Sequence, residues 1–76
     1  MQETLDKIIA LESRASELEA IRRKSDDAAL KCFKDGLIFR EKYPDAAAER
    51  DAANIELNEI EEELSILRVQ LKEEED

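Results

Sequence analysis

The chain has 76 residues, one cysteine and no histidine, and 43% of its side chains are charged. So short a chain forms one domain, 1–76, which neither an internal disulfide nor a histidine-containing zinc site can stabilise. The net charge of −9 argues against direct nucleic-acid binding, and no apolar run is long enough to span a membrane. We expect a cytoplasmic protein with a reduced thiol, whose small core is completed by self-association or by a partner protein.

The first predicted helix covers about 2–42. Its apolar side chains recur at alternating spacings of three and four residues, the heptad pattern of a helix packed against another helix. The clearest positions are Ile8, Leu11, Ala15 and Leu18. Two interpretations are open near Ser25: the helix continues, or Ser25 caps a new one. Continuity is favoured because neither glycine nor proline stands beside Ser25.

The stretch from Leu30 to Tyr43 holds every aromatic residue of the chain. Its apolar side chains occupy more than one side of the predicted helix, whereas a two-helix hairpin covers only one side. The surplus positions include Leu30, Phe33, Leu37 and Ile38. Gly36 lies among them, and we expect it to allow a close backbone approach or a kink.

The predicted turn is Tyr43-Pro44-Asp45, because a proline excludes the preceding residue from the helical conformation. A second helix follows over about 46–72, antiparallel to the first, with an acidic tail at 73–76. Its heptad seam consists of Ala53, Leu57, Ile60, Leu64, Leu67 and Leu71.

A turn at 43–45 sets the expected register of the two helices. It places Leu71 opposite Leu18, so that the first dozen residues extend beyond the second helix. The apolar side chains left without a partner are then self-association residues. They comprise Leu5, Ile8 and Leu11, together with Ile66 and Val69 on the back of the second helix.

The same register places Ile55 level with residue 34, near the turn. We therefore predict one apolar partner-binding patch formed by Leu30, Phe33, Leu37, Ile38, Ala52 and Ile55. Either a different protein or a second copy of the chain could bind this patch, and self-association is favoured.

An acidic face on the second helix includes Glu59, Glu62 and Glu63. Without histidine these carboxylates make a poor metal or acid–base site, so a solvated face is favoured. The specific alternative is that the face imitates the phosphates of DNA or RNA.

Two further groups have a structural explanation. Cys32 lies on the seam without a neighbouring base, which favours a buried thiol over a nucleophile. A basic group could bind phosphate, but ion pairing across the helices is favoured. It contains Arg22, Arg23, Lys24, Lys31 and Lys34.

The sequence thus predicts an all-α protein, an antiparallel two-helix coiled-coil hairpin that dimerises into a four-helix bundle. We expect a non-enzymatic module that binds and occupies the surface of a partner protein, with no catalytic, cofactor or metal residues. The alternative is an inhibitor, of the type encoded by phages and mobile elements, that blocks a nucleic-acid-binding protein with its acidic face.

Overall fold

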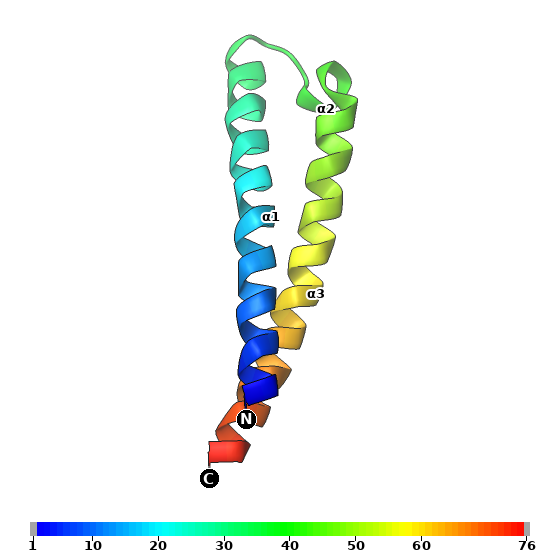
Figure 1. Cartoon of the computed structure of the whole chain (residues 1–76). Helices are drawn as coiled ribbons and strands as arrows, with labels where there is room; N and C mark the ends of the chain where they lie inside the picture. Colours follow the sequence, from blue (N-terminus) through cyan, green and yellow to red (C-terminus); the bar gives the residue numbers. More distant parts are fainter. Residues whose placement is uncertain (1, 76) are drawn as a thin grey trace.

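Two long helices lie side by side in the computed structural model, which describes residues 2–75 (Figure 1). Helix α1 comprises Gln2–Lys34, the single-turn helix α2 comprises Phe39–Lys42, and helix α3 comprises Pro44–Glu75. α1 and α3 run in opposite directions, and the Cα atoms extend over 56 × 15 × 14 Å. The described residues contain no strand, so the prediction of an all-α fold is confirmed.

The first long helix ends at Lys34 and not near residue 42 as predicted. Gly36 has a φ of +73°, a left-handed conformation that glycine adopts without steric cost. The Leu37 N–H donates a hydrogen bond of 2.8 Å to the carbonyl of Cys32, and the Gly36 N–H donates one of 3.1 Å to that of Phe33. These two bonds form a Schellman motif, which terminates the helix.

The expected close backbone approach at Gly36 is therefore wrong. Among the described residues beyond its chain neighbours, no atom lies within 4 Å of the place that a Cβ would occupy. Glycine is favoured here by its backbone angle and not by crowding.

The chain reverses direction over 35–43. Ile38 is extended, α2 forms one helical turn, and Tyr43 leaves the helical conformation because Pro44 follows it. Pro44 opens α3, where its missing N–H costs nothing. The predicted stop near residue 42 thus belongs to α2. The second helix begins two residues earlier than expected and continues through 73–75, which were predicted to form a tail; Asp76 lies outside the described residues.

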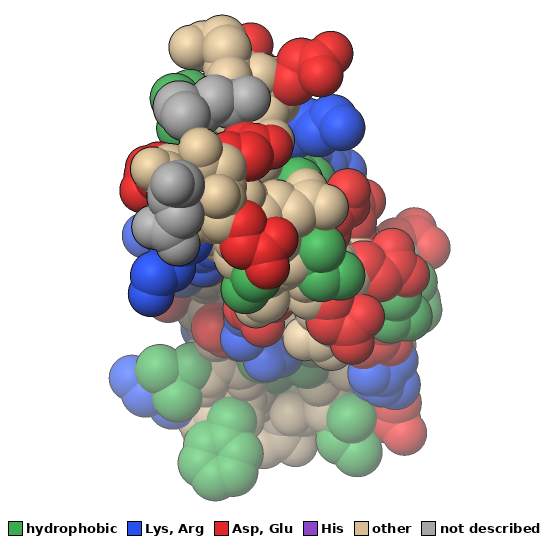
Figure 2. All heavy atoms as spheres, turned by 90° about the horizontal axis from the view of Figure 1, so that it is seen from below, with side chains coloured by type: hydrophobic (Ala, Val, Ile, Leu, Met, Phe, Trp, Pro, Cys, Tyr) green, Lys and Arg blue, Asp and Glu red, His purple; other side chains and the backbone are tan. Residues whose placement is uncertain are grey.

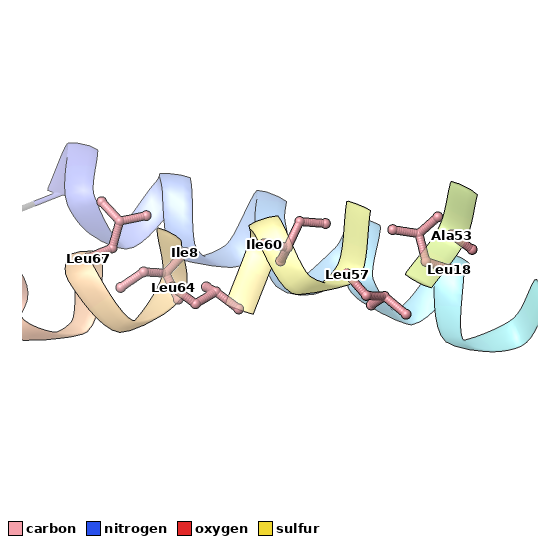
Figure 3. Packing of buried hydrophobic residues seen from close by; sticks show 7 residues of the cluster. All are labelled: Ile8, Leu18, Ala53, Leu57, Ile60, Leu64 and Leu67. Atoms are coloured by element: carbon pink, nitrogen blue, oxygen red, sulfur yellow. The ribbon is translucent and has the colours of Figure 1, made fainter. Parts of the chain in front are cut away.

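The core is the predicted heptad seam of α3 packed against α1 (Figure 3). Its buried members are Ile8, Leu18, Ala53, Leu57, Ile60, Leu64 and Leu67. Leu11, Ala15, Ile21 and Leu71 pack against them and are partly buried. Burying one Leu or Ile side chain contributes about 1.5–3 kcal/mol, so this seam is the main apolar source of stability.

The register of the two helices differs from the prediction. Leu18 lies beside Ala53 and Leu57, and not opposite Leu71 (Figure 3). The cause is the early turn at Gly36, which gives α1 and α3 nearly equal lengths. As a result Ile8 is only 6% exposed and Leu11 is partly buried, so the predicted apolar overhang is wrong.

Ser25, a buried polar residue on the seam of α1, has its hydrogen-bond partner inside the molecule. The Ser25 hydroxyl donates a hydrogen bond of 2.9 Å to the carbonyl of Ile21. α1 is continuous through this position, as the favoured interpretation required. Cys32 is a free, buried cysteine near the turn, which agrees with the structural interpretation.

Candidate functional site

The turn carries an exposed apolar surface, which we call the turn-end surface and define as Leu30, Phe33, Leu37 and Ile38. Phe33 is 79% exposed, the largest fraction among the large apolar side chains of residues 2–75. In Figure 2, which looks along the molecule from the ends of the chain, hydrophobic side chains stand out at the far, fainter end. The sequence prediction named these four residues, and the structure keeps them within nine positions around the Schellman motif.

The other two residues of the predicted patch lie elsewhere. Arg50 of α3 contacts Asp26 of α1, so Ile55, five residues further on, is level with about residue 21. Ile55 is therefore separated from Phe33 by about twelve residues along the axis, or ~18 Å. The single patch that included Ala52 and Ile55 is wrong, because it depended on a turn at 43–45.

Ala52 and Ile55 belong instead to an exposed line on α3, which also contains Ile66 and Val69. The spacing from one apolar position to the next places this line on the side of α3 opposite its core seam. Glu59 and Glu62 interrupt the line in the middle. We call this set of six residues the outer line of α3.

The predicted acidic residues Glu59, Glu62 and Glu63 are all exposed. Within residues 2–75, none of them lies within 4 Å of a basic group. Acidic side chains cover much of the surface in Figure 2.

Sequence reasoning missed the position of two aromatic side chains near the turn, Phe39 and Tyr43. The rings of Phe39 and Tyr43 lie with their centroids 6.0 Å apart and their planes inclined by 47°. They border a hollow of about 300 Å³ whose lining includes Ile21 and Ala28 of α1. Both aromatic residues were placed on a longer first helix, whereas the early turn brings them back beside it.

Ion pairs bridge α1 and α3. They are Arg14–Glu56, Arg50–Asp26 and Arg68–Glu12. The predicted pairing of the basic group is wrong, because these bridges use other arginines. No ion pair within residues 2–75 involves Arg22, Arg23, Lys24, Lys31 or Lys34.

The Arg14 guanidinium makes two hydrogen bonds to the Glu56 carboxylate, from Nε at 2.5 Å and from Nη2 at 3.2 Å. These bonds hold the pKa of Glu56 below its usual value and, with a further bond to Glu17, raise the pKa of Arg14. The hydrogen bonds from Arg40 of α2 likewise lower the pKa of Asp51 on α3. The carboxylates of Glu56 and Asp51 therefore stay ionised. Their ion pairs link α1 and α2 to α3 in the observed register.

Of the self-association residues predicted from the sequence, some are exposed in the structure and others belong to the core or pack against it. Leu5, Ile66 and Val69 are exposed, whereas Ile8 is in the core and Leu11 packs against it. Sequence reasoning missed Ile9, which is 56% exposed. The signal was present, because two adjacent isoleucines cannot both point toward the same partner helix.

The exposed residues of the turn-end surface and of the outer line of α3 have apolar and acidic side chains. No group of three or more His, Cys, Asp or Glu side chains in the described part of the chain is arranged to hold a metal ion. Within that same part, none of the helices is both long and apolar enough to cross a membrane. No protein-family model, curated protein or solved structure matches this chain.

Proposed function

We propose that the protein is a non-enzymatic interaction module that binds a partner protein through its turn-end surface. The observation that carries this proposal is the exposure of Phe33 at the apex of the helix pair. Aromatic side chains are enriched in protein interfaces, where a few buried anchors supply most of the binding energy.

The fold itself gives no reason for these apolar side chains. The α1–α3 seam is buried without Leu30, Phe33 or Ile38, which lie outside the core cluster. Exposed apolar side chains gathered at one end of a small protein are typical of an interaction site. A partner that covers them would gain roughly 25 cal/mol per Å² of apolar surface removed from water.

A photo-crosslinking experiment tests the proposal. A photoreactive phenylalanine analogue replaces Phe33 in the cell, and the same analogue at Ser13, an exposed polar position of α1, is the matched control. We expect a defined protein adduct from position 33 and none from position 13. The same adducts from both positions, or none from either, would contradict the proposal.

Affinity measurements then assign the surface. We expect the combined Phe33→Ala and Leu37→Ala variant to bind the captured partner at least about tenfold more weakly, mainly through faster dissociation. The matched control is the combined Ile55→Ala and Ile66→Ala variant, which removes equally exposed apolar groups from α3. Circular dichroism verifies that both variants fold.

We also propose that the module self-associates, with two coiled-coil helix pairs forming a four-helix bundle. Exposed apolar side chains on both long helices support this proposal, because one hairpin leaves them in water. The mass in solution tests it, since the monomer has a mass of 8.7 kDa.

A second candidate function rests on the charge of α3. Glu59, Glu62 and Glu63 present free carboxylates that a groove built for phosphates would accept. Under this alternative, changing all three to Gln weakens partner binding several-fold, and adding salt weakens wild-type binding steeply. Binding that is insensitive to both changes excludes nucleic-acid mimicry.

A further inference from the structure

One exposed face of α1 carries an apolar pair at each of its ends. Leu5 and Ile9 lie near the start of the helix, and Leu30 and Phe33 lie near its end. All four are exposed, and their spacing places them on one heptad stripe that also passes through 12, 16, 19, 23 and 26. This stripe is distinct from the seam toward α3, because Ile8 and Leu18 of that seam are buried.

We propose that a second copy of the chain covers this stripe, with its α1 antiparallel to the first. The proposal rests on the proposed function and names the occupant of part of the turn-end surface. When two such helices cross near residue 20, Leu5 and Ile9 of one copy meet Leu30 and Phe33 of the other. The arrangement is two-fold symmetric, so the same apolar cluster forms twice.

In the antiparallel orientation, the charges on the two copies of α1 are complementary. Residues 2–17 contain four acidic and two basic side chains, whereas residues 18–34 contain three acidic and five basic ones. Antiparallel pairing places the acidic half of each helix on the basic half of its partner, and parallel pairing places like charges together. Asp6, beside the first apolar pair, then approaches Lys34, beside the second.

The centre of the stripe is polar, and its charges suit the same orientation. Glu12 and Asp26 are already held by Arg68 and Arg50 of their own chain. Glu19 and Arg23 have no ion-pair partner within residues 2–75. Near the crossing point, Glu19 of one copy lies within about one helical turn of Arg23 of the other, which gives two equivalent opposite-charge contacts.

The outer line of α3 suits a second copy less well. Its apolar side chains are as exposed as those of α1, but Glu59 and Glu62 interrupt it near the middle. Two copies joined along this line would bring these four carboxylates together in either orientation. Like charges in contact oppose association. Charge therefore favours the stripe on α1, where Glu12 and Asp26 are paired with arginines of their own chain and, within residues 2–75, only Glu19 is an acid without such a pair.

Sedimentation equilibrium at tens of micromolar measures the association. We expect the wild type to have twice the monomer mass. Leu30→Glu should raise the dimer dissociation constant by about tenfold or more, because it places a charge in an apolar contact and against the acidic half of the partner helix. Ile66→Glu, the same change on α3, is the matched control and should leave the dimer intact.

Crosslinking between chains tests the orientation. In a Cys32→Ala background, one preparation carries Ile9→Cys and a second carries Phe33→Cys. A short bismaleimide should join the two different chains when the preparations are mixed. It should not join two Ile9→Cys chains, whose thiols lie at opposite ends of the dimer.

Two results would overturn the proposal. One is a folded wild type that stays monomeric at these concentrations, and the other is crosslinking of Ile9→Cys chains to each other in place of Phe33→Cys chains. Neither result decides the proposed function, because a protein adduct at position 33 would then come from a different protein. An adduct whose mass shows two copies of this chain supports both.

Discussion

The hydroxyl group of Thr4 on α1 donates a hydrogen bond of 2.9 Å to the carboxylate of Glu74 on α3, across 70 residues of sequence. Thr4 is buried even though it lies in the first turn of its helix. The bond places the start of α1 beside the end of α3, so that the helices face each other along their whole lengths.

This register can be tested with pairs of cysteines in a Cys32→Ala background. Thr4→Cys with Glu74→Cys should be joined within one chain by a short bismaleimide. Ser16→Cys with Glu74→Cys should not, because Ser16 lies twelve residues, or about 18 Å, from Thr4 along the helix. Mass spectrometry of dilute protein distinguishes crosslinking within a chain from crosslinking between chains. The reverse result would support the register that a turn at 43–45 requires.

Gly36→Ala should destabilise the protein by about 1–2 kcal/mol, because an L-residue with a side chain is strained at positive φ. The open space around the glycine leaves the backbone as the only source of the loss. Gly36→Asn should cost less, since asparagine tolerates this conformation better. Urea unfolding measures both values. If alanine stabilised the protein, α1 would have to continue beyond residue 36.

Leu64→Ala should lower the free energy of unfolding by roughly 2–5 kcal/mol, enough to unfold much of so small a protein. Leu64 is 6% exposed and belongs to the core cluster. Ile66→Ala, two residues away but 60% exposed, is the matched control and should change stability far less. Thermal unfolding followed by circular dichroism compares the two variants. Equal losses would mean that the seam has been assigned to the wrong face of α3.

The Arg14–Glu56 pair should make part of the stability depend on pH. The lowered pKa of Glu56 means that the folded protein favours the ionised carboxylate. The pair therefore contributes stability above the usual glutamate pKa of about 4.3, and this contribution is lost as the pH falls through the lowered value. Its size should be small and should decrease with salt, because both side chains are exposed.

Glu56→Gln tests this linkage, with Glu62→Gln as a control that removes the same charge from a site without an ion pair. At pH 7 the Glu56→Gln variant should melt below the Glu62→Gln variant, and the difference should disappear near pH 2. A difference that persisted in strong acid would show that the carboxylate charge is not its source.

The heptad seam of α3 could be predicted from the sequence because its signal is periodic. Ala53 to Leu67 repeat without interruption over more than two heptads, and each predicted seam position in that range is buried. The end of α1 could not be found in this way, because the pattern of spacings runs on through Gly36 to Phe39 and Tyr43. A local signal was present: Gly36 is followed by an apolar Leu37, which is typical of a Schellman motif.

The helix end at Gly36 was not predicted, and this limited how well the surfaces could be predicted. Residues that are close in sequence, such as Leu30 and Phe33, kept their relation because one helix holds them both. The predicted relation between Phe33 and Ile55 failed, because it joined two helices through an incorrect register. The partners of the arginines depend on that register too, so spacing along the chain could not identify them.

The connection over 35–43 has a consequence for the order in which the helix pair forms. Contacts near the turn close small loops of chain, whereas the Thr4–Glu74 contact closes one of 70 residues. Once the contacts beside the turn exist, each further layer adds only a few residues to a loop that is already closed, so its extra entropy cost is small. The pair should therefore close from the turn outward and reopen in the reverse order. Backbone amides near the open end should then exchange with solvent before those around Leu57, in the middle of the seam.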